Sequence, residues 1–220
     1  FFMKRTHHCN ELRLPDAGSE ATLSGWVHSC RDLGGVIFID IRDREGRTQA
    51  VFDPQETDPV LVEMASKLHS ESVISVSGMV RQRPADTANP KIHTGDVEIA
   101  AAAMEVHNHA AVLPFQIDDP EAAAKVNEER RLQYRYLDLR RPEMARNLRL
   151  RSKVAMCTRV FMEEQGFLDV ETPTLFKSTP EGAREFLTPS RLAPGKFYAL
   201  PQSPQQFKQI LMCAGVDKYF

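Results

Sequence analysis

The chain has 220 residues, of which 42% are hydrophobic, 26% charged and 8% aromatic, and its formal net charge is −2. This composition is typical of a globular protein and argues against wholesale disorder, and the length allows one large domain or two small ones. No apolar run approaches the roughly 20 residues that a membrane span needs, and no signal-peptide pattern opens the chain. The four cysteines form no C-x-x-C pair, so we expect a cytoplasmic protein without a disulfide framework or a structural zinc site.

The charge is distributed unevenly along the chain. Residues 1–110 hold 11 basic and 16 acidic side chains, whereas residues 111–220 hold 17 and 14. A protein that coats DNA or RNA is strongly basic, because neutralisation of phosphates dominates such binding. We therefore expect any nucleic-acid partner to be recognised locally and not through bulk charge.

The first half of the chain consists of short stretches in which apolar and polar residues alternate, as they do in strands. We predict strands over 22–31, 36–42, 46–52, 72–83 and 96–106, with a helix over 58–69. Five strands with a helix between the third and the fourth is the order of an OB-fold β-barrel. The sequence thus predicts an OB-fold domain over residues 1–110.

The same alternation predicts which side chains share the outer face of this barrel. Ile37, Ile39 and Ile41 would point inward, which leaves Phe38 outside. The polar side chains expected on the outer face with it are those of Arg31, Gln49, Arg81 and Glu98. An aromatic ring on such a face can stack an unpaired base, and its polar neighbours can bind base edges. The pattern alone leaves open that Phe38 instead packs under a loop or a neighbouring domain.

Beyond Pro114 and Pro120 the apolar spacing changes from strand-like to helical, and we interpret residues 111–130 as a hinge. Pro142 suits the first position of a long helix and Gly166 suits its C-terminal cap. We predict strands over 167–171 and 197–200, then a last helix with Ser203 as N-cap and Pro204 at its first position. Since no polar tail follows that helix, we expect a truncated chain.

Several groups in the second half have ordinary structural explanations. Eight arginines make residues 130–151 basic, which is typical of a solvated helix face balanced by acidic neighbours, with phosphate contact as the alternative. The histidines lack the spacing of metal ligands, so we expect no metal site. Gln205 and Lys208 lie three residues apart and share one helix face, a geometry suited to holding a carboxylate. Spacing alone makes this a weak signal.

Longer segments carry a more specific signal. Residues 161–173 (FMEEQGFLDVETP) resemble motif 1 of the class II aminoacyl-tRNA synthetases, a long helix and a strand that ends in a proline. Residues 134–140 (YRYLDLR) resemble the stretch that leads into this motif. Residues 179–184 (TPEGAR) and 202–208 (QSPQQFK) look like the aspartate-specific members of bacterial and organellar type, whereas lysine- and asparagine-specific relatives differ in the second of these. The resemblance covers nearly the whole chain.

The resemblance implies an α+β protein. Its N-terminal five-stranded OB-fold barrel would bind the anticodon, and residues 131–220 would form the first part of a class II catalytic domain, an antiparallel sheet with helices. The reaction implied is ATP-dependent activation of L-aspartate and its transfer to the 3′ end of tRNA(Asp). The homodimer interface of the family would include Pro173.

The resemblance also assigns roles to residues. Lys208 would face the side-chain carboxylate of aspartate and Glu181 its ammonium. The full set expected to bind aspartate is Glu181, Ser203, Gln205 and Lys208. Phe38 would stack on the middle anticodon base. The other expected anticodon contacts are Arg31, Gln49 and Glu98, to which the outer-face pattern adds Arg81.

The chain also departs from the family. Relatives often have an arginine run before Arg31, where this chain has Ser29 and Cys30. The family's ATP-binding motifs 2 and 3 are expected beyond Phe220. ATP and Mg²⁺ would therefore be bound by the whole protein, and the 220 residues alone would be inactive.

Two alternatives stay open. One is a non-catalytic RNA-binding protein derived from a synthetase, against which the intact aspartate-binding set argues. The other is an asparagine- or lysine-specific relative.

Overall fold

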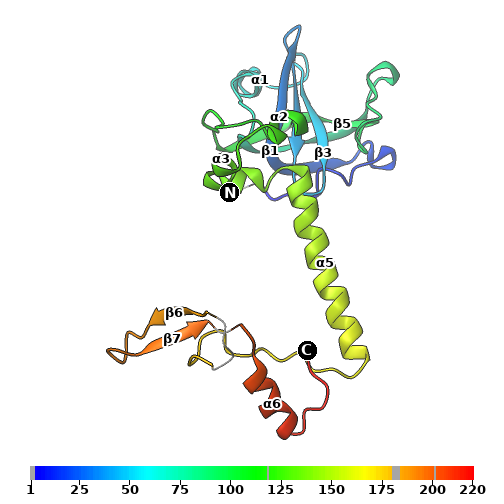
Figure 1. The fold of residues 1–220 in the computed structure, drawn as a ribbon. Coiled ribbons are helices and arrows are strands. Elements are labelled where there is room, and N and C mark those ends of the chain that lie inside the picture. The colour runs from blue at the N-terminus through cyan, green and yellow to red at the C-terminus, as the bar shows by residue number, and fades with distance from the viewer. Residues whose placement is uncertain (1–2, 118, 180–183, 201) are drawn as a thin grey trace. The chain divides into compact units, whose positions relative to one another are not determined.

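The computed structural model describes residues 3–117, 119–179, 184–200 and 202–220. The chain forms two compact units, Phe1–Ala145 and Arg146–Phe220. The first contains a five-stranded barrel, and the second contains most of a long helix, a small sheet and a shorter helix (Figure 1).

Five strands of the first unit close into a barrel. They are β1 (Glu20–Leu33), β2 (Val36–Arg42), β3 (Arg47–Phe52), β4 (Val73–Gln82) and β5 (Val97–Asn108). Their order is β1-β2-β3-β5-β4, with β3 and β5 parallel and the other neighbours antiparallel. Helix α1 (Pro59–Ser66) lies between β3 and β4 in the chain. Two short 3-10 helices, η1 (Leu14–Asp16) and η2 (Ala85–Thr87), precede β1 and follow β4. The predicted OB-fold barrel is confirmed.

The interior of the barrel is apolar because large aliphatic residues recur at every second position of its strands. Ile37, Ile39 and Ile41 are at most 2% exposed, as the alternation predicts. The predicted inward residues of the last two strands, Ile74, Val76, Val80, Val97 and Ile99, are fully buried as well. The polar residues between them are left on the outside.

The β1–β2 hairpin turns on two glycines. Gly34 and Gly35 have φ values of 66° and 91°, a region that favours glycine because other residues clash there. The Asp32 carboxylate accepts a hydrogen bond of 2.9 Å from the backbone N–H of Gly35. The tight turn holds Arg31 directly opposite Phe38 on the neighbouring strand.

After the barrel the chain forms three short helices, α2 (Pro120–Ala124), α3 (Glu128–Gln133) and α4 (Arg135–Asp138). Asp138 is fully buried, and its carboxylate forms ion pairs with Arg135 and, at 3.0 Å, with Arg141. Arg131 lies 3.9 Å from the same carboxylate. The expectation that the basic stretch is a solvated helix face is wrong for Arg141, which is only 5% exposed.

A second buried carboxylate joins this segment to the barrel. The side chain of Glu71 is 1% exposed, and it accepts hydrogen bonds from Arg42 (2.6 Å) and Arg140 (2.9 Å). The two guanidinium carbons lie 5.7 and 4.7 Å from the ring centre of Trp26. We call Trp26, Arg42, Glu71 and Arg140 the Glu71 clamp. It fastens the residues that precede helix α5 to the barrel wall.

Helix α5 (Pro142–Glu164) begins at Pro142, as predicted, and Gly166 follows it with a φ of 78° that suits a cap. The second unit also contains strands β6 (Phe186–Pro189) and β7 (Phe197–Leu200), which pair antiparallel, and helix α6 (Gln205–Cys213). In the described ranges, no helix is both long enough and apolar enough to span a membrane.

Two expectations for this unit are wrong. Residues 167–171 form no strand but a single bridge from Leu168 to Tyr219, flanked by backbone hydrogen bonds to Lys218 and Phe220. Helix α6 begins at Gln205, and Pro204 is its N-cap with a non-helical ψ of 26°. Ser203 therefore lies one position outside the cap. Strand β6 was not among the predicted strands.

Candidate functional site

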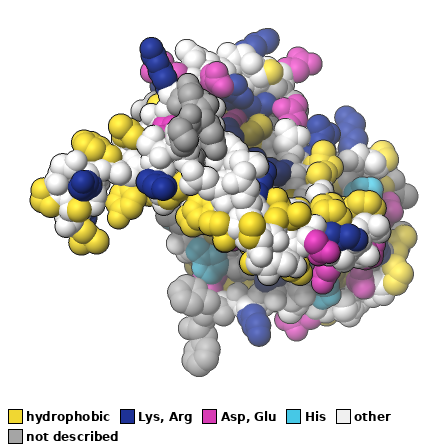
Figure 2. Space-filling model, turned by 60° about the horizontal axis from the view of Figure 1, so that its bottom comes forward, with side chains coloured by type: hydrophobic (Ala, Val, Ile, Leu, Met, Phe, Trp, Pro, Cys, Tyr) yellow, Lys and Arg dark blue, Asp and Glu magenta, His cyan; other side chains and the backbone are white. Residues whose placement is uncertain are grey.

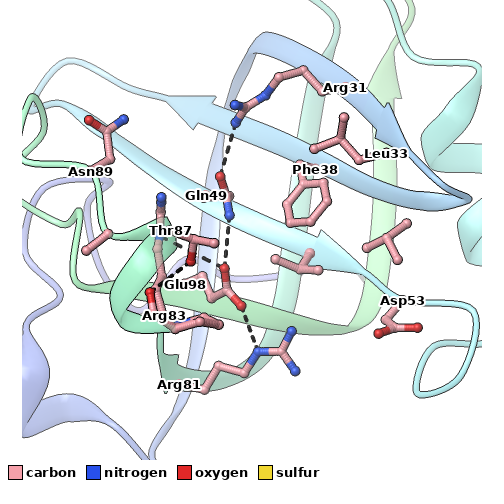
Figure 3. Close-up of a pocket in the computed structure, with 14 residues that line it drawn as sticks. Arg31, Leu33, Phe38, Gln49, Asp53, Arg81, Arg83, Thr87, Asn89 and Glu98 are labelled. Atoms are coloured by element: carbon pink, nitrogen blue, oxygen red, sulfur yellow. Dashed lines mark hydrogen bonds and ion pairs between the residues drawn. The ribbon is translucent and has the colours of Figure 1, made fainter.

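A pocket of about 530 Å³ opens on the outer face of the barrel (Figure 3). Each of the five strands contributes one of the residues predicted for this face: Arg31, Phe38, Gln49, Arg81 and Glu98. The strand register explains the convergence, since Glu98 lies opposite both Gln49 and Arg81. The structure thus brings all five together in one pocket.

A chain of hydrogen bonds crosses this pocket (Figure 3). Arg31 Nη2 donates to Gln49 Oε1 (3.1 Å), and Gln49 Nε2 donates to Glu98 Oε2 (2.9 Å). Arg81 Nε donates to Glu98 Oε1 (2.8 Å). Because each donor meets an acceptor, the orientation of the nearly buried Gln49 amide is set before any ligand enters.

The Phe38 ring lies beside this chain of hydrogen bonds (Figure 3). The apolar part of the lining around it comes from Leu33, Val36 and Val51. The ring therefore faces the pocket and not the barrel core. A planar base that stacks on Phe38 can present its edge to Gln49 and Glu98.

The two arginines near the end of β4 are held differently. Burial lowers the pKa of Arg81, but hydrogen bonds and charge from Glu98 and Glu56 outweigh it and raise that pKa above its usual value. Arg83 is only 5% exposed, and burial lowers its pKa. Its Nε donates to the Val97 carbonyl (3.0 Å), but its Nη2 has no hydrogen-bond partner within the described ranges. That nitrogen is a buried donor whose hydrogen bond is not satisfied within the described ranges.

Sequence reasoning missed some of the lining. Arg83 follows Arg81 by two residues, so the alternation that selected Arg81 also selects Arg83. Thr87 and Asn89 lie in the loop between β4 and β5, and no residue pattern fixes the path of such a loop.

The predicted aspartate-binding residues lie in the second unit. Gln205 begins helix α6 and is exposed. Lys208 is half-buried, and its backbone N–H donates to the Pro204 carbonyl oxygen (3.0 Å). The two residues share a helix face, as their spacing predicts. Ser203 precedes the helix, and Glu181 lies outside the described residues. Pro173 is exposed and lies in an irregular segment.

The described part of the chain contains no group of three or more His, Cys, Asp or Glu side chains that could hold a metal ion.

Two protein-family models match the chain. The OB-fold nucleic acid binding domain matches residues 21–106, and the class II tRNA synthetases (D, K and N) match residues 127–220. Together they leave only residues 1–20 and 107–126 unmatched.

Curated proteins resemble nearly the whole chain. The Aspartate--tRNA(Asp/Asn) ligase of Opitutus terrae is 55% identical over 218 residues, which is 99% of this chain and 36% of that protein. The ligase of the same name from Methylacidiphilum infernorum is 56% identical over 216 residues, covering 98% and 35%. The chain spans about a third of the length of these relatives.

Among solved structures, the asparaginyl-tRNA synthetase of Pyrococcus horikoshii, complexed with asparaginyl-adenylate, matches with a TM-score of 0.83 and 26% identity. The match covers 99% of this chain and 47% of that one.

Proposed function

We propose that the chain is part of an aspartate–tRNA ligase, because residues 127–220 match the class II tRNA synthetases (D, K and N) and ligases of that name are 55% and 56% identical over nearly the whole chain. Residues 1–110 would be its anticodon-binding domain, 111–130 its hinge and 131–220 the first part of its catalytic domain. The extent of the two family matches supports these bounds. The whole protein would act in the cytoplasm.

The proposed reaction has two steps. L-aspartate and ATP give aspartyl-adenylate and pyrophosphate, and the aspartyl group then passes to the 3′ end of tRNA(Asp). Neither step needs a nucleophile from the enzyme, so catalysis rests on positioning the substrates and stabilising charge in the transition state. ATP, with Mg²⁺, would be bound by the whole protein, and the 220 residues alone are expected to be inactive.

The observation that carries the proposal is the convergence of five separated residues on one polar pocket with an aromatic ring. We infer that Phe38 stacks on the middle base of the anticodon. The base edges would be bound by Arg31, Gln49, Arg81 and Glu98. Stacking gives affinity and the preset hydrogen bonds give selectivity, as in recognition of single-stranded RNA generally.

For the amino acid, we propose that Lys208 faces the side-chain carboxylate of aspartate. No ion pair within the described ranges occupies the Lys208 ammonium, which supports this role. Gln205 and Ser203 would complete the contacts from the start of α6, and Glu181 would bind the aspartate ammonium. A charged partner is the means by which a site can separate aspartate from the neutral, similarly shaped asparagine.

We also propose a homodimer whose interface includes Pro173. Large hydrophobic side chains are exposed on the surface of the chain (Figure 2). Those exposed along α5 are Leu148, Leu150, Val154, Met156, Val160 and Phe161. A helix with this much uncovered apolar surface is suited to packing against further protein.

The test is amino-acid-dependent exchange of pyrophosphate into ATP by the whole protein, with aspartate, asparagine and lysine compared. Exchange with aspartate alone is expected, and exchange with either of the others would overturn the aspartate assignment. Charging of tRNA(Asp) and tRNA(Asn) is then measured with the same protein, since the relatives' names include both tRNAs. Binding of tRNA without any exchange would favour a non-catalytic RNA-binding protein.

A further inference from the structure

The outer face of the barrel continues along β2 and β3 beyond the pocket of Figure 3. Successive cross-strand pairs on this face are Phe38–Val51, Asp40–Gln49 and Arg42–Arg47. Because two residues along a strand span about 7 Å, the last pair lies close to the edge of the pocket. Like charges directly opposite each other destabilise a sheet, so the Arg42–Arg47 pair calls for compensation.

Of these two arginines, only Arg42 pairs with a carboxylate among the described residues. Arg42 donates to Glu71, whose other oxygen accepts from Arg140. Arg47 forms no ion pair with any residue that the structure describes. The Glu71 carboxylate thus pairs with Arg42 and Arg140, and the half-buried Arg47 has no carboxylate partner within the described ranges.

His28 contacts both arginines but brings no negative charge to them. A bulge in β1 between Val27 and Ser29 turns the His28 ring to the outer face. Its Nδ1 lies 3.2 Å from Arg42 Nη1 and its Nε2 lies 2.6 Å from Arg47 Nη1. A neutral imidazole has one acceptor nitrogen and a protonated one has none, so His28 cannot accept from both arginines. At most one of the two guanidinium groups therefore donates to His28.

We propose that Arg47, His28 and Arg42 bind a phosphate of the tRNA strand whose base enters the pocket. Phosphate oxygens would supply acceptors and negative charge beside the Arg42–Arg47 pair, and guanidinium groups match their geometry. A site beside the stacked base suits a strand that lays its backbone along a positive groove. The inference rests on the proposed function, because its ligand is tRNA.

The test measures how tRNA(Asp) binding by the whole protein depends on salt. For a single strand, each phosphate contact adds about 0.7 to the slope of log affinity against log salt. Arg47→Gln is expected to reduce that slope by about this amount and to weaken binding to tRNA(Asp) and to a tRNA with an altered anticodon by the same factor. Arg47→Lys, which keeps the charge, is expected to keep the slope.

Arg44→Gln is the matched control. Arg44 lies three residues before Arg47, is exposed and pairs with Glu45 at 2.9 Å, so its replacement removes the same charge from the neighbouring turn. An unchanged slope in Arg47→Gln, or an equal loss in Arg44→Gln, would overturn the phosphate site.

A second measurement needs no variant. Phenylglyoxal modifies accessible arginines of the wild-type protein, and mass spectrometry locates the modified sites with and without tRNA(Asp). Protection of Arg47 but not Arg44 is expected, and Arg47 modified equally in both samples would refute the site. Failure of the wild-type protein to bind any tRNA would instead refute the proposed function and the inference with it.

Discussion

At the scale of single residues, Phe38 differs from its neighbours because it lines the pocket without taking part in the hydrogen bonds. Phe38→Ala should leave those bonds intact and remove one stacking surface, which is expected to weaken tRNA binding by about 1–3 kcal/mol. Aspartate-dependent pyrophosphate exchange should not change. Filter binding and exchange by the whole protein, measured in parallel, check both expectations.

Ile39→Val is the control for Phe38, since Ile39 lies next to it on β2 and is fully buried in the core. This change should lower stability slightly and leave tRNA affinity intact. If Phe38→Ala lowered exchange as much as binding, Phe38 would be a structural residue.

Lys208 allows a test of amino-acid selection. Lys208→Met keeps most of the stem and removes the charge, so kcat/KM for aspartate in the whole enzyme should fall by about 100-fold, about 3 kcal/mol of transition-state stabilisation. Asparagine has no charge to lose and should change far less. Adenylate formation with both amino acids is the measurement. Selectivity that survives the substitution would make Lys208 an ordinary helix lysine.

The Asp43 carboxylate is expected to make the free energy of unfolding fall at low pH. Burial raises the pKa of its carboxyl, but hydrogen bonds from the N–H groups of Cys9, Glu45 and Gly46 and from His8 outweigh burial and hold the pKa below its usual value. The unfolded group titrates at about pH 3.9, so its stabilising contribution is complete above that pH. It is lost as the pH falls further, through the lower pKa of the folded state. Asp43→Asn should therefore unfold with a flatter pH dependence below about pH 5 in urea titrations, and an unchanged slope would contradict this.

These residues also show what sequence alone could provide. The pocket residues were predictable because a strand repeats every two residues, which fixes the face once the core is recognised. The roles of Lys208 and Glu181 came from resemblance, since spacing on one helix face is common to many solvated helices. The Arg83 Nη2, which has no hydrogen-bond partner among the residues that the structure describes, was beyond prediction, because its surroundings depend on how segments far apart in the sequence pack.

At the scale of elements, the Glu71 clamp joins a strand, the turn before β4 and the segment that leads into α5. Glu71→Ala would leave two guanidinium groups without their carboxylate, and breaking a buried pair in this way costs about 3–5 kcal/mol. Urea unfolding of the whole protein is the measurement. Glu71→Gln should lose less, because an amide oxygen still accepts one hydrogen bond.

Glu63→Ala provides the comparison for the clamp. Glu63 pairs with Lys67 on the surface of α1, where water screens the charges, so little change is expected. Equal stability of the Glu63 and Glu71 variants would mean that the clamp adds nothing to stability.

The strands also show which elements a local sequence pattern can predict and which it cannot. The barrel strands were found because one face of each is buried. All four residues of β6 are exposed, so no alternation marks it as a strand. The bridge from Leu168 to Tyr219 depends on a partner far along the chain, which no local pattern specifies.

At the scale of the whole molecule, the proposed dimer is the clearest prediction. The exposed apolar side chains of α5 are expected to be covered by a second copy, as an isologous interface requires. Light scattering on the whole protein should give twice the mass of one chain. A clean monomer at micromolar concentration would remove the basis for the motif 1 assignment.

The two sheets of this chain differ in one further respect, which concerns aggregation. The barrel is closed, so none of its five strands offers a row of unpaired N–H and C=O groups to another molecule. In the β6–β7 sheet, no described strand pairs with the outer side of β6, and Phe186 on that strand is 79% exposed. Such an apolar edge is a template for strand addition between molecules. When this chain is concentrated by itself, intermolecular strand addition should begin at β6, and a lysine in place of Leu187 should delay it.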